Sequence, residues 1–115
     1  MISEEIKKDL PEHIRRVVEC IPKGSKRPIT VREISSLTGF SSTAIRSYVS
    51  KAIISYGIAI GASNTAGNSG YFIIETSEER EKAKSNLISR IREMNKRVKA
   101  LDAIGDPNQE TLKIG

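Results

Sequence analysis

The chain has 115 residues, of which 37% are hydrophobic and 29% charged, and its formal net charge is +5. This length suits one small domain, with or without an extended arm, and the single cysteine, Cys20, excludes an internal disulfide and a cysteine zinc site. No apolar run approaches the ~20 residues of a membrane span and no signal-peptide pattern opens the chain, so we expect a cytoplasmic protein without a membrane partner.

The basic excess favours an acidic partner, but it is unevenly distributed along the chain. Most lysines and arginines lie in residues 1–28 and 77–102, whereas residues 29–75 hold three basic side chains against two acidic ones. The charge is therefore weak evidence for nucleic-acid binding by itself.

The first helix is expected to begin near residue 10 and to end before the sequence PKGSKRP at residues 22–28, which contains two prolines and a glycine. Its apolar positions recur at intervals of three and four, and they are Ile6, Leu10, Ile14, Val17, Val18 and Ile21. Pro11 suits the first turn, with Asp9 or Leu10 as the N-cap. The pattern also allows an earlier short turn over residues 3–9.

A second helix of about nine residues is expected to follow. Thr30 and Glu33 match the spacing of a capping box, in which the side chain of each residue accepts a hydrogen bond from the backbone N–H of the other. Its apolar stripe would be Val31, Ile34 and Leu37. Gly39 is expected to end the helix, because glycine adopts positive φ at little cost.

A third helix is expected to start with Ser41 or Ser42 as its N-cap and to end at Gly57. Its buried face would consist of Ile45, Tyr48, Val49, Ala52 and Ile53. Two short strands then follow, IAIGAS at residues 58–63 and YFIIET at residues 71–76, joined by the loop NTAGNSG. We expect a β-hairpin that is stable only when it packs on the helices.

The helical period returns at Ser77, a suitable N-cap that precedes acidic residues in the first turn. This last helix is expected to run to residue 104, and Gly105 and Pro107 would end it. An a/d seam of about two heptads consists of Leu87, Ile91, Met94, Val98 and Leu101. Residues 105–115 are expected to form a flexible tail.

This order of elements predicts a mainly α fold with a small β-hairpin, namely a winged helix-turn-helix domain over residues 1–76 followed by a long helix over residues 77–104. The small core shared by the second and third helices would contain Ile34, Leu37, Phe40, Ile45, Tyr48 and Val49. Gly39 would make the sharp turn between these helices.

The outer face of the third helix is expected to contact DNA, because a helix in the major groove needs donors and acceptors and few bulky apolar groups. Short hydroxyl side chains allow close approach to phosphates, and Arg46 can make a bidentate contact with guanine. The expected contact residues on this face are Ser41, Ser42, Thr43, Arg46, Ser47, Ser50 and Lys51, together with Arg32 on the second helix.

The segments TVREISSLTGFSSTAIRSYVSKAI, YGIAIGAS and NSGYFI resemble the small winged helix-turn-helix DNA-binding proteins of bacteriophages and related mobile elements. The resemblance covers roughly residues 28–101, including the long charged helix. It implies double-stranded DNA binding by the third helix and by a wing with Ser63, Asn64, Thr65 and Asn68. This wing differs from many in the family because it contains no lysine or arginine.

Two roles remain open for the seam of the last helix: packing on the first helix, or pairing with the same helix of a second copy. A homodimer is favoured, since a nearly neutral domain makes few phosphate contacts and two copies double them. The expected function is therefore transcription regulation or replication-origin binding by a homodimer. The alternative is an adaptor that binds a protein partner through the C-terminal helix, while single-stranded nucleic acid is disfavoured by the few aromatic residues.

Catalysis finds no support in the sequence. His13 is the only histidine and has no cysteine or carboxylate at metal-ligand spacing, so no metal and no cofactor are expected. Cys20 lies beside Ile21 on the apolar side of the first helix and is expected to be a buried small hydrophobe. The chain is not expected to be an enzyme.

Overall fold

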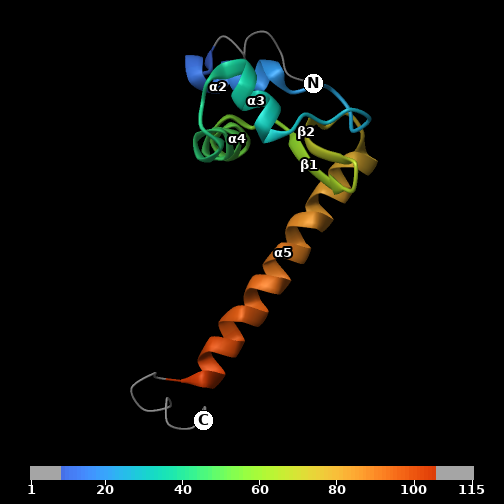
Figure 1. Ribbon diagram of the computed structural model, residues 1–115. Helices are drawn as coiled ribbons and strands as arrows, with labels where there is room; N and C mark the ends of the chain where they lie inside the picture. Colours follow the sequence, from blue (N-terminus) through green and yellow to red (C-terminus); the bar gives the residue numbers. More distant parts are fainter. Residues whose placement is uncertain (1–8, 106–115) are drawn as a thin grey trace. The chain divides into compact units, whose positions relative to one another are not determined.

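A computed structural model describes residues 9–105 of the chain (Figure 1). Its elements are the helices α2 (Glu12–Cys20), α3 (Val31–Thr38), α4 (Ser42–Tyr56) and α5 (Ser77–Ile104), and the strands β1 (Ile60–Thr65) and β2 (Asn68–Ile73). The prediction of a mainly α chain with one small antiparallel hairpin is confirmed. The turn expected over residues 3–9 and the tail expected over residues 105–115 lie, apart from Asp9 and Gly105, outside the described residues.

The chain divides into two compact units, the first ending at Ala83 and the second beginning at Lys84. The division falls within α5, so the first two turns of this helix belong to the same unit as α2, α3, α4 and the hairpin.

The N-cap of α2 lies one or two residues later than the expected cap, Leu10 or Asp9, and the helix begins at Glu12. Its N-cap is Pro11, whose φ of −53° and ψ of 147° are extended and whose carbonyl accepts from the Arg15 N–H at 2.9 Å. No side chain caps this helix end. Proline at the cap removes no hydrogen bond, because the N–H groups at a helix start have no partner within the helix. The helix ends at Cys20, as expected.

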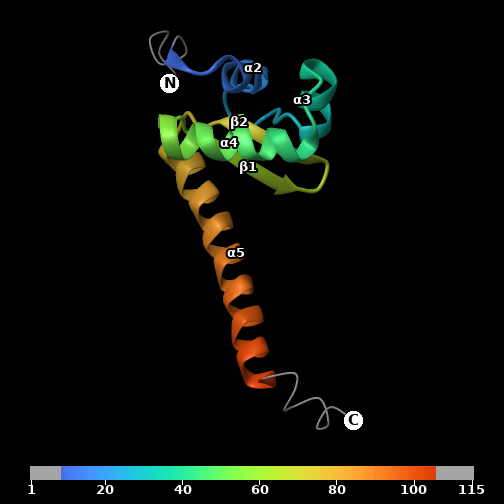
Figure 2. The ribbon, with the colours of Figure 1, turned by 90° about the vertical axis from the view of Figure 1, so that its left-hand side faces the viewer.

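The core of the first unit lies where α2, α3 and α4 meet the base of the hairpin (Figure 2). Its buried members are Leu10, Ile14, Val17, Val18, Ile21, Ile34, Ile45, Val49, Ala52, Ile58, Ile60 and Ile73. Phe40 and Tyr48 are partly buried against them, so most of the expected shared core is present.

Leu37, expected in the shared core, and Ile53, expected on the buried face of the third helix, are exposed instead. Leu37 is 67% exposed, because the inward stripe of α3 runs through Val31, Ile34, Ser35 and Thr38, and Leu37 lies beside that stripe. Ile53 is 40% exposed because it lies at the margin of the α4 face centred on Val49 and Ala52.

The hairpin is more extended toward its tip than the sequence predicted. Antiparallel pairing runs from Ile60 opposite Ile73 to Thr65 opposite Asn68, so only Ala66 and Gly67 form the turn. Asn64, Thr65 and Asn68, which were expected in a loop, therefore lie in strands. The reversal needs only two residues because Gly67 adopts a φ of 78°.

The segment between α2 and α3 pairs with β2, which the sequence did not indicate. The N–H of Gly24 donates to the carbonyl of Ile73 at 2.8 Å, while Ile29 and Tyr71 exchange two hydrogen bonds of 2.9 and 2.7 Å. Gly70 allows this close approach, since it has a φ of 138° and a Cβ at that position would lie 2.3 Å from the Ile29 carbonyl oxygen. The segment thus fixes the hairpin to the helices.

The N-cap of α5 is Thr76 and not Ser77 as expected. The Thr76 hydroxyl accepts from the N–H of Glu79 at 3.0 Å, and its carbonyl accepts from the N–H of Arg80 at 3.1 Å. The Glu79 carboxylate in turn accepts from the N–H groups of Glu75 and Ser25, both at 2.8 Å. These bonds, that to Glu75 first, lower the pKa of Glu79 and join the start of α5 to the segment after α2.

In the second unit, α5 continues to Ile104 and has no buried residue. Gly105 ends it with a φ of 80° and donates its N–H to the Leu101 carbonyl at 3.2 Å, as the sequence predicted. The exposed apolar side chains of this unit are Leu87, Ile88, Ile91, Met94, Val98, Leu101 and Ile104.

Candidate nucleic-acid interface

The turn between α3 and α4 has the local structure that the sequence predicted. Thr30 and Glu33 form a reciprocal capping box at the start of α3, and Gly39 ends this helix with a φ of 80°. Ser41 is the N-cap of α4, and its hydroxyl accepts from the N–H of Ala44 at 3.1 Å. The three residues between Thr38 and Ser42 thus reverse the chain and orient α4.

Side-chain hydrogen bonds fix this turn from within. The Ser35 hydroxyl donates to the carbonyl of Phe40 at 2.7 Å, and the Thr38 hydroxyl accepts from the N–H of Phe40 at 3.2 Å while donating to the Ile34 carbonyl at 2.8 Å. These bonds explain why polar Ser35 and Thr38 occupy inward positions of α3, and they pair both backbone groups of Phe40 in the turn.

Arg16 of α2 fixes the same turn from outside. Its Nη2 donates to the carbonyl of Thr38 at 3.0 Å, and its guanidinium carbon lies 4.9 Å from the centre of the Phe40 ring. This role of Arg16 was not predictable from the sequence, because an arginine on the polar side of a short helix gives no local sign of a partner 22 residues away. Arg16 is therefore a positioning residue for α4.

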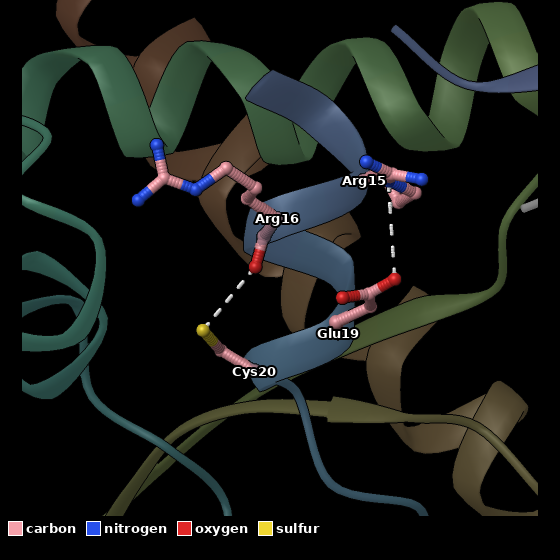
Figure 3. Close-up of polar contacts among 4 residues, drawn as sticks. All are labelled: Arg15, Arg16, Glu19 and Cys20. Atoms are coloured by element: carbon pink, nitrogen blue, oxygen red, sulfur yellow. Dashed lines mark hydrogen bonds and ion pairs between the residues drawn. The ribbon is translucent and has the colours of Figure 1, made fainter. Parts of the chain in front are cut away.

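Two further polar contacts lie within α2, one between Arg15 and Glu19 and one between Cys20 and Arg16 (Figure 3). Arg15 and Glu19 form an exposed ion pair at 3.9 Å, on a different side of the helix from Arg16. The Cys20 thiol donates to the Arg16 carbonyl at 3.2 Å, and burial is the largest of the causes that raise the pKa of this thiol. Cys20 is half-buried against the core and not fully buried as expected.

An aromatic cluster joins α2 to α4. The Tyr48 ring makes an edge contact with Phe40 at 5.4 Å between centroids and a tilted contact with His13 at 4.6 Å. His13 therefore packs between helices. No cluster of three or more histidine, cysteine, aspartate or glutamate side chains that could hold a metal is present within residues 9–105.

The solvent face of α4 contains the residues that the sequence predicted for DNA contact. Ile45, Val49 and Ala52 are buried on the opposite face. The exposed residues are Ser41, Ser42, Thr43, Arg46, Ser47, Ser50 and Lys51. Apart from the capping bond of Ser41, none of them has a side-chain hydrogen bond or ion pair with another residue of the described range. Their donors and acceptors are available to a ligand.

The electrostatics of this face favour an anion. Helix α4 contains Arg46 and Lys51 and no acidic residue. The free N–H groups of its first turn, at Ser42 and Thr43, add the positive end of the helix dipole. Ile54 continues the same face toward the C-terminus and is 80% exposed, which the sequence analysis did not anticipate.

The expected hairpin contacts are arranged differently. Asn64, Thr65 and Asn68 are exposed on the strands, whereas Ser63 is half-buried and its hydroxyl accepts from the N–H of Thr65 at 3.5 Å. The Asn68 amide donates to the carbonyl of Ser25 at 3.4 Å, so this side chain contacts the segment after α2. Among residues 9–105, no hydrogen bond or ion pair joins this set to the exposed face of α4.

Arg32 is exposed on α3, and its carbonyl accepts from the Ser36 hydroxyl at 3.2 Å. Its guanidinium has no partner in the described part of the chain. Within that part, no helix is both long and apolar enough to cross a membrane.

No protein-family model, curated protein or solved structure matches the chain.

Proposed function

We propose that the chain is a sequence-specific double-stranded DNA-binding protein of the winged helix-turn-helix class. In this assignment α3 and α4 form the helix-turn-helix, α4 is the recognition helix and the β1–β2 hairpin is the wing. The order of the elements supports the assignment, as does the pairing of the segment after α2 with β2, which attaches the hairpin to the three helices.

One observation carries the proposal. Over its first ten residues, helix α4 presents a solvent face of short hydroxyl and basic side chains with no acidic residue, while Ile45 and Val49 are buried behind it and exposed Ile54 follows toward the C-terminus. Such a face suits a phosphate-lined groove, because acidic groups would repel phosphates and large apolar groups would prevent hydrogen bonding to base edges.

Each residue type has a separate role on DNA. Arg46, near the middle of the face, reads a guanine through two hydrogen bonds to its O6 and N7 atoms. Ser42 and Thr43, at the helix start, bind a phosphate together with backbone N–H groups. Lys51 adds a phosphate contact that raises affinity without selecting sequence.

The biological role follows from the resemblance to phage and mobile-element proteins. The chain would act as a transcription regulator or a replication origin-binding factor, with no catalytic step and no cofactor. It acts as a homodimer, because a wing without lysine or arginine leaves each copy few phosphate contacts.

The test begins by selecting duplexes that the purified chain retains from a random-sequence duplex library. Binding of the selected duplex is then measured by fluorescence anisotropy for the native chain, Arg46→Ala and Arg15→Ala. Arg15 is the matched control, since it is an exposed arginine on α2 that, within residues 9–105, pairs only with Glu19. We expect Arg46→Ala to lose about 1–3 kcal/mol of specific binding and Arg15→Ala to change it little. Equal affinities for the native chain and Arg46→Ala would refute the assignment of α4.

A second candidate function is supported by the exposed apolar residues of the first unit. Leu37 and Ile54, 67% and 80% exposed, would suit contact with another protein, and residues 29–75 are nearly neutral. An adaptor of this kind would show no affinity for duplex DNA even at low salt, whereas a DNA-binding protein loses affinity steeply as salt rises. A titration at two salt concentrations separates the two functions.

A further inference from the structure

The second unit contains an apolar stripe that no residue of the described chain covers. Its five seam residues are between 55% and 67% exposed, and they are Leu87, Ile91, Met94, Val98 and Leu101. Ile88 and Ile104 flank the seam and are 44% and 47% exposed. A row of large apolar side chains at intervals of four and three residues is the pattern of a coiled-coil surface.

The first unit does not offer α2 as the cover for this stripe. The apolar side chains of α2, namely Ile14, Val17 and Val18, are buried in the core of the first unit. The exposed residues of α2 are the charged ones Glu12, Arg15, Arg16 and Glu19. The alternative of packing α5 on α2 therefore lacks an apolar surface on α2.

The heptad positions indicate how many helices would associate. The spacing assigns Ile91 and Val98 to position a, and Leu87, Met94 and Leu101 to position d. Among parallel coiled coils, β-branched residues at a with leucine at d favour two strands, and Met94 is the one d residue here that is not leucine.

The flanking charges distinguish the two orientations of such a pair. Arg90 and Arg97 occupy position g, and Asp102 occupies position e five residues after Arg97. In a parallel pair, Arg97 would face Asp102 of the partner subunit, whereas an antiparallel pair would place arginines at g opposite each other. Neither Arg97 nor Asp102 forms an ion pair with another residue in the range 9–105.

We propose that α5 of two copies forms a parallel coiled coil along residues 87–101, with Arg97 of each copy paired to Asp102 of the partner subunit. This inference rests on the proposed homodimer but not on DNA binding. Because the helices are parallel, the N-terminal ends of both α5 helices lie at the same end of the coiled coil. In an antiparallel pair they would lie at opposite ends of the coiled coil.

A parallel pair has a consequence for the DNA site. Two first units attached at one end of a two-fold symmetric coiled coil present two equivalent α4 helices. The preferred duplex should then contain two inverted half-sites, with centres separated by about one helical turn or a multiple of it.

Sedimentation equilibrium of the full chain without DNA, over micromolar to millimolar concentrations, tests the association. We expect a reversible dimer, monomeric Ile91→Asp and dimeric Ser89→Asp. Ser89 lies two residues from Ile91 on the outer side of the helix, so the control adds the same charge outside the seam. A monomeric native chain, a larger oligomer, or equal effects of the two variants would overturn the proposal.

Disulfide trapping tests the orientation. In a Cys20→Ser background, Leu87→Cys should form a disulfide-linked dimer with oxidised glutathione, since equivalent d positions face each other only in a parallel pair. Ser89→Cys should not form this dimer under the same conditions. A dimer that Leu87→Cys fails to crosslink would overturn the parallel arrangement.

Charge reversal tests the pairing of Arg97. Arg97→Asp and Asp102→Arg should each weaken dimerisation about two- to fivefold, and the double variant should restore it. Failure of the double variant to recover affinity would contradict this pairing. The outcomes are distinguishable from those for DNA binding: a parallel dimer without duplex affinity overturns only the proposed DNA function, whereas a duplex-binding monomer overturns this inference and the proposed homodimer but not DNA binding by α4.

Discussion

Gly70→Ala should detach the hairpin from the segment that follows α2. A Cβ at this position would lie 2.3 Å from the Ile29 oxygen and 2.5 Å from its carbonyl carbon, both backbone atoms. The strand must therefore move away, which breaks the two hydrogen bonds between Ile29 and Tyr71. Each bond contributes about 1 kcal/mol net. The φ of 138° adds about 1–3 kcal/mol of strain for a non-glycine residue.

The expected loss in the free energy of unfolding is therefore about 3–5 kcal/mol, a large fraction of the stability of a small domain. Gly67→Ala is the matched control, because Gly67 has a φ of 78° but no atom within 4 Å of the position of its Cβ. That variant should lose only about 1–2 kcal/mol, the cost of a left-handed conformation.

Urea unfolding of both variants, followed by far-UV circular dichroism, measures the difference from the transition midpoints at constant slope. Similar small losses in Gly70→Ala and Gly67→Ala would refute the close packing of β2 on the segment after α2.

Two further predictions concern contacts outside the hairpin. Arg16→Ala should lower the free energy of unfolding by about 1–2 kcal/mol and weaken duplex binding, because it removes the hydrogen bond to Thr38 and the contact with Phe40. Arg15→Ala breaks only an exposed ion pair, so it should change both measurements little. Equal effects of the two variants would contradict the positioning role of Arg16. Glu79→Gln should be less stable than the native chain above the ordinary pKa of 4.5, since the folded carboxylate has a lowered pKa. That difference in the free energy of unfolding should disappear as the pH falls through the folded pKa of Glu79. Urea unfolding of both chains at a series of pH values measures it. A difference that does not change with pH would contradict the stabilising role of the Glu79 carboxylate.

The local features of the fold could be read from the sequence because they depend on neighbouring residues. The capping box of Thr30 and Glu33, the positive φ of Gly39 and the N-cap of Ser41 each follow from the chemistry of a few adjacent positions. The exposed face of α4 was predictable for a similar reason, since its apolar periodicity fixes which side is buried.

The features that sequence reasoning missed depend on distant contacts. Periodicity placed Leu37 in an apolar stripe but could not show which side of α3 the other helices cover. The pairing of residues 22–29 with β2 and the bond from Arg16 to Thr38 join segments far apart in the chain. The predicted strands stopped short of the hairpin tip because asparagines and glycines are typical of loops. In the structure the strand pairing extends through them.

Measurement of base-pair discrimination shows whether α4 reads base sequence. Affinities of the native chain and of Arg46→Ala are measured for the selected duplex and for every single base-pair change in one half-site. Replacement of one particular guanine should cost the native chain about 1–3 kcal/mol of binding free energy. Arg46→Ala should lose this discrimination at that position alone. An unchanged discrimination profile in Arg46→Ala, at any overall affinity, would contradict the claim.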